Sequence, residues 1–317
     1  MRVVLLDTIW AQALAALLDP RLSVTVVDSK DANRRDAALA DADVLVSARF
    51  SADMGRVVKH LRLLVCPAAG TEYIDRDALP EGVVLVKGTG HEIAMAEYII
   101  GSIVALRQRF SEADAGLRQG EWRFGFYGGD RMLAELHGSN IGFVGFGGVG
   151  QEAARRALAF GMRPAAVTLH PERARQHAMD LEFLGKLSER SDVDRLTTWS
   201  DQLVLCCELS PLTRGMFDAR RFALMKPSAV IVNVARGAVA VETDLYEALA
   251  GRQIAGTALD VWYHYPSEPG QIRHPSDLPF NKLDNVVMTP HASGWTQAAK
   301  QRRLEAMARA INEFART

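Results

Sequence analysis

Short apolar runs alternate with longer segments of mixed polarity from residue 2 to residue 90. The runs are rich in Val, Leu and Ile, which is typical of strands buried on both faces, and the longer segments carry apolar positions at helical spacing. The predicted strands are 3–6, 24–27, 44–46, 63–66 and 83–86, and the predicted helices are 10–18, 32–40 and 51–60. This alternation predicts a parallel sheet covered by helices on both faces.

A second alternation begins at residue 140, after a long helical pattern at 93–109. The charged stretch 171–194 within it is predicted to be a solvated helix face with a loop, and a last helix, 295–314, is long enough to return to the first unit. Six strands are predicted, enough for a complete doubly wound nucleotide-binding domain: 140–144, 165–169, 203–206, 229–234, 256–261 and 286–288. The predicted fold class is α/β, with two doubly wound parallel-sheet domains.

Between the two alternations, residues 119–138 form a polar, glycine-rich segment with four aromatic residues, Trp122, Phe124, Phe126 and Tyr127. Exposed aromatic residues among glycines predict an arm that packs on another surface, such as a second subunit. An ordered loop on the chain's own surface fits the same pattern.

The glycine motif Gly145-x-Gly147-x-x-Gly150 directly follows the apolar run 141–144. A strand, a glycine turn and a helix together form a dinucleotide site. The first glycine permits the tight turn, the second lets the backbone approach a pyrophosphate, and the third lets helix 151–159 pack closely on its strand. Taken alone, the motif also fits a glycine-rich turn without a ligand.

Length and composition narrow the class of protein. The 317 residues fit two domains of about 150 residues each. A hydrophobic content of 48% with 24% charged residues is typical of a globular enzyme, and a net charge of −1 offers no basic field, so no nucleic-acid partner is expected. The apolar start is too short for a secretory signal, and Glu97 interrupts the window 93–106, so no membrane span is expected. Cys66, Cys206 and Cys207 are interpreted as reduced core residues of a cytoplasmic protein, and no metal site is predicted.

Polar residues follow three predicted strands of the second half, at the sheet edge where open α/β sheets bind ligands. Arg236 precedes Gly237 and offers a planar fork to a carboxylate, or it caps a turn at the surface. His291 follows Pro290, which holds the approach rigid, and it either faces a substrate or hydrogen-bonds in the core. Asp260 begins a segment that ends in a cluster of aromatic residues.

Together with 67–75 (PAAGTEYID) and 95–97 (MAE), these segments resemble the D-isomer-specific 2-hydroxyacid dehydrogenase family in order and spacing, over essentially the whole chain. The resemblance implies a flavodoxin-like substrate-binding domain, residues 1–92 plus 293–317. It implies a Rossmann NAD(P)-binding domain, residues 93–292, with a cleft between the two. It also implies a homodimer, to which the aromatic segment would contribute.

The resemblance implies a role for several residues. Arg236 would bind the substrate carboxylate and carbonyl, and His291 would exchange the proton on the C2 oxygen as hydride moves between C2 and nicotinamide. Backbone amides of Ala69 and Gly70 would hold the carboxylate from the other domain. The residues expected at the cofactor are Gly145, Phe146, Gly147, Gly148, Val149, Gly150, His170, Arg173, Cys207, Glu208, Val234, Ala235, Arg236, Asp260, His291, Ser293 and Gly294.

The chain departs from the family at the histidine's partner. Most members have a glutamate 29 positions after the arginine, where this chain has Tyr265. A carboxylate beside an imidazole raises its pKa above about 6.5, and a neutral phenol does not. Tyr265 is interpreted as orienting His291 through a hydrogen bond and leaving it less basic. Two alternatives stay open: Tyr265 only lines an altered pocket, or the hydride donor has no hydroxyl proton, as in formate dehydrogenases, which carry glutamine at this place.

Two further positions are candidates for substrate contact. His91 lies four residues before Met95, where family members often have asparagine or another polar residue, although a solvated loop histidine is the alternative. Arg49, just after strand 44–46, is a second cation for the pocket mouth.

The position that selects between NAD and NADP is also unusual. The chain reads Thr168-Leu169-His170 about 20 residues past Gly150, where an acid would accept the ribose hydroxyls of NAD. His170 or Arg173 would accept a 2′-phosphate, so NADP is slightly favoured over NAD, although Arg173 and Arg175 also fit a solvated helix.

The function expected is an NAD(P)-dependent dehydrogenase or reductase of a small D-2-hydroxy or 2-oxo acid that the sequence does not name. The alternatives are a formate-type or other acid-independent hydride-transfer enzyme, and a nucleotide-sensing regulatory protein of the same fold. The presence of both Arg236 and His291 argues against the regulatory protein.

Overall fold

The computed structural model describes residues 1–6, 9–129, 132–176, 179–268 and 270–316. The chain forms two compact units. The first comprises Met1–His91 with Thr296–Thr317, and the second comprises Glu92–Trp295. The α/β fold class predicted from the sequence is confirmed, because each unit is built on a parallel sheet with helices.

The first unit has a five-stranded parallel sheet in the order β2-β1-β3-β4-β5. Its strands are β1 Arg2–Leu6, β2 Ser23–Val27, β3 Val44–Val46, β4 Leu63–Cys66 and β5 Val84–Lys87. Its helices are α1 Ala11–Ala15, α2 Ala32–Ala40, α3 Ala52–Val57 and α11 Gln297–Phe314. The apolar faces of α1 and α11 share one core with the sheet, and α2 and α3 contribute to the other. The last helix therefore packs in the first unit, as predicted, and it starts after residue 295 because the Thr296 hydroxyl caps it by accepting from the Ala299 amide (3.1 Å).

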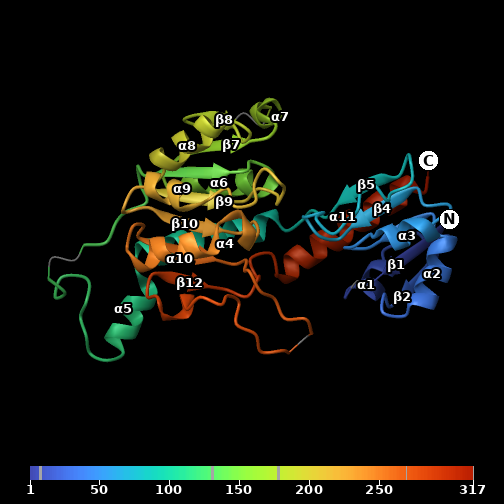
Figure 1. The fold of residues 1–317 in the computed structure, drawn as a ribbon, viewed down its shortest axis with the longest axis horizontal. Helices are drawn as coiled ribbons and strands as arrows, with labels where there is room; N and C mark the ends of the chain where they lie inside the picture. Colours follow the sequence, from blue (N-terminus) through green and yellow to red (C-terminus); the bar gives the residue numbers. More distant parts are fainter. Residues whose placement is uncertain (7–8, 130–131, 177–178, 269, 317) are drawn as a thin grey trace. The chain divides into compact units, whose positions relative to one another are not determined.

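The second unit has a seven-stranded parallel sheet in the order β12-β11-β10-β9-β6-β7-β8. In Figure 1 the labelled strands of this sheet, β8, β7, β9, β10 and β12, follow one another from top to bottom in the same sense. The strands are β6 Asn140–Val144, β7 Arg163–Thr168, β8 Leu184–Lys186, β9 Gln202–Leu205, β10 Val230–Asn233, β11 Gly256–Leu259 and β12 Val286–Met288. The order reverses between β6 and β9, which is the switch point at which such sheets bind nucleotides.

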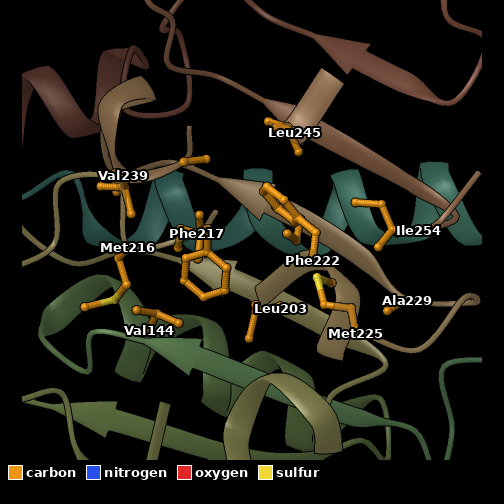
Figure 2. Close-up of a cluster of buried hydrophobic side chains, with 14 of the residues drawn as sticks. Val144, Leu203, Met216, Phe217, Phe222, Met225, Ala229, Val239, Leu245 and Ile254 are labelled. Carbon is orange, nitrogen blue, oxygen red and sulfur yellow. The ribbon is translucent and has the colours of Figure 1, made fainter. Parts of the chain in front are cut away.

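Helices cover both faces of this sheet. One face packs against α4 Glu92–Arg107 and α6 Gly148–Ala159. The other packs against α8 Arg190–Trp199, α9 Ala219–Leu224 and α10 Glu242–Ala250, where Figure 2 shows Phe217 and Phe222 among aliphatic side chains. The remaining helices are α5 Phe110–Leu117, α7 Pro171–Arg175 and the short 3₁₀ segments Gly237–Val239 and Phe280–Lys282.

The sequence prediction was wrong in the charged stretch 171–194. This stretch contains α7, the start of α8 and the edge strand β8, so the second sheet has seven strands rather than six. The strand was missed because it has three residues, one of them glycine, and no apolar run. Helix α5 was also missed, and the described residues of 119–138 form neither helix nor strand.

No helix in the described part of the chain is long and apolar enough to cross a membrane. Cys66, Cys206 and Cys207 are free thiols, as predicted. Burial raises the pKa of the Cys66 thiol, so it stays in its unreactive neutral form at neutral pH.

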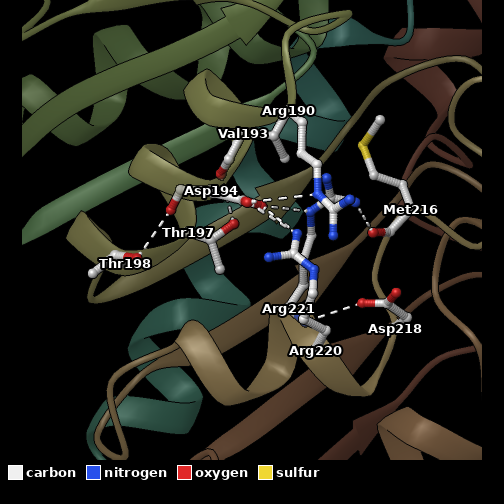
Figure 3. A network of polar contacts seen from close by, with 9 residues as sticks. All are labelled: Arg190, Val193, Asp194, Thr197, Thr198, Met216, Asp218, Arg220 and Arg221. Carbon is white, nitrogen blue, oxygen red and sulfur yellow. Dashed lines mark hydrogen bonds and ion pairs between the residues drawn. The ribbon is translucent and has the colours of Figure 1, made fainter.

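A polar network joins α8 to α9 (Figure 3). The Asp194 carboxylate accepts hydrogen bonds from Arg220 Nη2 (2.7 and 3.0 Å) and from Arg221 Nε (3.1 Å), and Arg190 lies 3.9 Å away. The guanidinium groups of Arg220, the larger contributor, and Arg221 hold the pKa of Asp194 below its usual range despite partial burial.

We expect Asp194→Asn to lower the free energy of unfolding by about 1 to 2 kcal/mol at pH 7, because an amide cannot replace the charged acceptor. A carboxyl group with a depressed pKa stabilises the fold above its unfolded pKa and loses that effect as pH falls through its folded pKa. The difference between the two proteins, measured by urea denaturation, should therefore shrink as the pH falls below the unfolded carboxyl pKa of about 3.9. Asp114→Asn, at an exposed pair with Arg118, should cost less, and an equal or larger cost would contradict the role of Asp194.

Candidate functional site

Three adjacent strands of the second sheet end in one row. Asn233 on β10 pairs with Leu259 on β11, which pairs with Met288 on β12. Parallel strands lie about 4.8 Å apart, so the segments that leave β10 and β12 start about 10 Å from each other. Arg236 lies three residues beyond the first of these ends, and His291 lies three residues beyond the last. The structure thus brings both predicted residues to the same edge of one sheet.

Trp262, which follows the middle strand, connects the two flanking segments. Its indole N–H donates to the carbonyl oxygen of Thr289 (2.8 Å), and its backbone N–H donates to the Tyr265 hydroxyl oxygen (3.1 Å). On the other side, a Cβ at Gly237 would lie 2.5 Å from the Trp262 carbonyl oxygen, so only glycine permits this approach. Sequence reasoning grouped Trp262 with the aromatic cluster but gave it no role, because its central position depends on strand order.

Asp260 fixes the segment that carries His291. Its carboxylate is fully buried and accepts three hydrogen bonds, from the Thr289 hydroxyl (2.6 Å), the Ala292 amide (2.7 Å) and the Ser293 amide (2.9 Å). These donors stand on both sides of His291 in the sequence. The carboxylate therefore clamps the turn before and after the imidazole.

The backbone of His291 shows what the clamp achieves. Its φ of 58° lies in the left-handed region, which costs a non-glycine residue about 1 kcal/mol or more. The clamp around it compensates for this strain and sets the direction in which the side chain leaves the turn. The imidazole ring is exposed and lies against the Tyr265 ring, with 5.6 Å between centroids and 53° between planes.

A further residue, Tyr98 on α4, supports the clamp and was not predicted from the sequence. Its hydroxyl lies 2.8 Å from the Thr289 hydroxyl. Because Thr289 donates its proton to Asp260, Tyr98 is the donor in this contact. Burial raises the pKa of Tyr98, which keeps the hydroxyl protonated for this purpose.

Arg236 leaves the edge in an extended conformation, with φ −147° and ψ 150°, and is half-buried. Asn233 shapes this exit, since its side chain accepts from the Ala235 amide (3.0 Å) and donates to the Arg236 carbonyl (3.1 Å). The guanidinium Nη1 donates to the Ala235 carbonyl (2.7 Å). A guanidinium is a planar fork that can bind a carboxylate through two parallel N–H groups.

The glycine turn between β6 and α6 fits the phosphates of a dinucleotide. Gly145 has a φ of +96°, and a Cβ there would lie 2.7 Å from the Cys207 Cα. A Cβ on Gly150 would lie 2.8 Å from the Gly145 carbonyl oxygen, so this glycine lets α6 pack closely against the turn that follows its strand. Gly147 has no atom within 4 Å of its Cβ position and caps α6 without a side-chain hydrogen bond. The turn thus leaves room beside Gly147 at the start of α6, where the backbone would approach a pyrophosphate.

The other predicted cofactor residues of the second unit lie along the same edge. Phe146, Gly148 and Val149 continue the turn into α6. The sequence predicted that this helix would start at residue 151, but it starts at Gly148. Those at the ends of the neighbouring strands are Cys207, Glu208, Val234, Ala235, Ser293 and Gly294. Whether each contacts a cofactor stays a prediction.

At the end of β7, His170 is the N-cap of α7 and its ring Nδ1 lies 3.3 Å from the Glu172 carboxylate. Arg173 and Arg175 are exposed on the same short helix. The segment after β7 therefore carries two cations, Arg173 and Arg175, and one acid, Glu172.

Four predicted substrate residues lie in the first unit. Ala69 and Gly70 follow β4, in a loop held by Arg303, which donates to the Pro67 carbonyl (2.8 Å), and by Cys66, whose thiol lies 3.6 Å from the Gly70 carbonyl. Arg49 is exposed and its guanidinium stacks over the Tyr73 ring (4.9 Å). His91 is 7% exposed, so it is not the solvated loop histidine that was one of its two interpretations. Their contact with substrate stays a prediction.

Comparisons with known proteins match most of the second unit, which contains this sheet edge, to one protein family. Residues 100–293 match the NAD binding domain of the D-isomer specific 2-hydroxyacid dehydrogenases. The chain is 33% identical to a glyoxylate reductase of Thermococcus onnurineus over 282 residues, which cover 86% of this chain and 80% of the relative. The protein belongs to the D-isomer specific 2-hydroxyacid dehydrogenase family.

Two other similarities set the extent of the match. The chain is 33% identical to the D-3-phosphoglycerate dehydrogenase of Methanocaldococcus jannaschii over 83% of this chain, but it spans only 48% of that relative. A crystal structure of a Thermus thermophilus protein has a TM-score of 0.74 and 28% sequence identity, and the match covers 97% of this chain and 94% of that one. The whole fold is therefore shared, while the chain spans about half the length of the phosphoglycerate dehydrogenases.

We expect Asp260→Asn to release the turn around His291. The amide has one acceptor oxygen and would present a donor to either Ser293 or Ala292, so at least one charge-assisted bond of about 1.5 to 3 kcal/mol is lost. Hydrogen exchange of the Ala292 and Ser293 amides should accelerate about 10- to 100-fold. Asp284→Asn, at an exposed pair with Arg252, should leave both rates unchanged, whereas unaltered rates in Asp260→Asn would refute the clamp.

Proposed function

We propose that this protein is an NAD(P)-dependent oxidoreductase that transfers hydride between nicotinamide and C2 of a small D-2-hydroxy or 2-oxo acid. The observation that carries the proposal is that β10 and β12 end in one row, with Arg236 and His291 each three residues beyond its strand end and Trp262 in contact with both segments. Membership of the family and the fit of the glycine turn support it.

The reaction needs a cation, a proton carrier and a hydride. The nicotinamide supplies or accepts the hydride. Arg236 binds the carboxylate with its fork, which fixes the C2 carbon relative to the ring. His291 holds or accepts the proton of the C2 oxygen, and the Asp260 clamp keeps the imidazole in place while it does so.

The direct test is oxidation of NADPH or NADH by a panel of 2-oxo acids, followed by absorbance. We expect turnover, and we expect Arg236→Lys to lower kcat/KM about 10- to 100-fold, because lysine cannot form two parallel hydrogen bonds. Arg252→Lys at the exposed pair with Asp284 is the matched control and should keep the wild-type value. Cofactor binding without turnover on every acid would favour the nucleotide-sensing protein instead.

We propose NADP as the preferred cofactor, since β7 ends without an acid and Arg173 stands on the following helix. Glu172 beside His170 works against a large preference, because its charge repels a 2′-phosphate. We expect Arg173→Ala to lower kcat/KM for NADPH about tenfold and to leave NADH unchanged. Arg175→Ala on the same helix is the control, and an equal loss with both cofactors would disprove a 2′-phosphate contact.

We propose that Tyr265 orients His291 and places a neutral phenol, rather than a carboxylate, against its ring. The ring contact and the bond from the Trp262 amide to the phenol oxygen support this role. We expect Tyr265→Glu to move the acidic group in the pH profile of kcat/KM for 2-oxo acid reduction upward by about 1 unit or more, since a carboxylate stabilises imidazolium. Superimposable profiles would leave Tyr265 as a pocket-lining residue.

We infer a homodimer in which the segment 119–138 contacts a second copy. Trp122, Phe126 and Tyr127 are exposed and pack on one another edge to face in this segment. Figure 1 shows the described residues that follow α5 looping away from the seven-stranded sheet of their own unit. The free thiols of the chain support a reducing compartment, the cytoplasm.

A further inference from the structure

The last helix, α11, holds a loop of the first unit through one arginine. Arg303 Nη2 donates to the Pro67 carbonyl oxygen (2.8 Å), and the guanidinium carbon lies 5.5 Å from the centroid of the Trp10 ring. A cation is attracted to an aromatic face, so the ring helps to keep the guanidinium in place. Pro67 begins the loop after β4, in which Ala69 and Gly70 are expected to hold the substrate carboxylate. One end of this loop is therefore fixed to α11.

The loop after β5 closes on the same segment. The Gly88 amide donates to the Ala68 carbonyl oxygen (3.1 Å), and a Cβ at Gly88 would lie 2.4 Å from the Pro67 carbonyl oxygen, so only glycine permits this contact. Arg302, the neighbouring arginine of α11, donates through Nε to the Gly90 carbonyl oxygen (2.9 Å). Two adjacent arginines of one helix thus hold two adjacent loops.

These contacts set the direction of two backbone amides. A peptide unit is planar and trans, so its N–H points opposite to its C=O. The unit with the Pro67 carbonyl carries the Ala68 N–H, which therefore points away from the Arg303 guanidinium. The unit with the Ala68 carbonyl carries the Ala69 N–H, which points away from Gly88. Neither N–H has an acceptor among the residues that the structure describes, so both are available to an anionic group.

We propose that Arg303 is a positioning residue for the substrate, because it orients the loop after β4 so that the amides of Ala68 and Ala69 bind the carboxylate of the acid. This role rests on the proposed function, in which a 2-oxo or 2-hydroxy acid is bound. The direction of a backbone amide is set by what its peptide unit contacts. Arg303 makes the charge-assisted contact of this loop, which is the stronger kind of hydrogen bond, and it acts through the Pro67 peptide unit.

The test compares Arg303→Met with the wild type in the reduction of glyoxylate or pyruvate by NADPH. Methionine keeps a long apolar side chain and loses the donors. We expect KM for the acid to rise at least about tenfold while kcat stays within about threefold, because an interaction made equally in the ground and transition states changes KM alone. Kd for NADPH should not change. Arg303→Lys keeps a charged donor and should recover most of the loss, and equal KM values in the two variants would overturn the role.

Arg309→Met is the matched control, since Arg309 is exposed on the same helix, and it should keep the wild-type KM. An unchanged KM in Arg303→Met would overturn the role of Arg303 and leave the proposed function intact. A wild-type protein that reduces no acid would overturn the proposed function and this role with it.

Hydrogen exchange follows the loop without turnover. The Gly88 amide, which donates to Ala68, should exchange at least about tenfold faster in Arg303→Met and at the wild-type rate in Arg309→Met, because only the first variant releases the loop. A higher KM without faster exchange at Gly88 would overturn the role, since charge rather than loop geometry would then bind the acid. Equally faster exchange in strand β1 would also overturn it, because the first unit as a whole would then be destabilised.

Discussion

The candidate site depends on the buried carboxylate of Asp260. Three hydrogen bonds from one turn converge on it, and between their donors His291 is held in a left-handed conformation that it would not keep unaided. A buried charge is costly unless such donors surround it, so the turn stabilises the carboxylate as much as the carboxylate stabilises the turn. The Tyr98 hydroxyl extends this mutual dependence to α4.

The order of the strands places the clamped turn beside the segment that carries Arg236. Because β11 lies between β10 and β12, Trp262 reaches the segments that leave both neighbours. Gly237 is needed on one side so that the backbone fits against the Trp262 carbonyl, and Thr289 receives the indole N–H on the other. An arginine and a histidine 55 positions apart in the chain thus share one edge of the sheet.

The strands of both sheets and the glycine turn were largely predictable from sequence. Buried parallel strands are continuous apolar runs, and glycine motifs have a fixed geometry. The bounds of β3, β4, β6 and β12 agree with the predictions, whereas β8 was missed, since an edge strand of three residues has no apolar pattern. The clamp was not predictable in the same way. Asp260 and Ser293 are both expected at the cofactor by resemblance, but only the fold shows that they bond to each other.

The roles of Arg236 and His291 are tested most directly by a crystal structure of the protein with NADP and a non-reactive 2-oxo acid analogue. The account predicts two parallel hydrogen bonds from Arg236 to the carboxylate and a His291 ring nitrogen about 2.6 to 3.2 Å from the C2 oxygen, with the Asp260 bonds retained. A complex in which the analogue binds while Arg236 or His291 points away into solvent would contradict it.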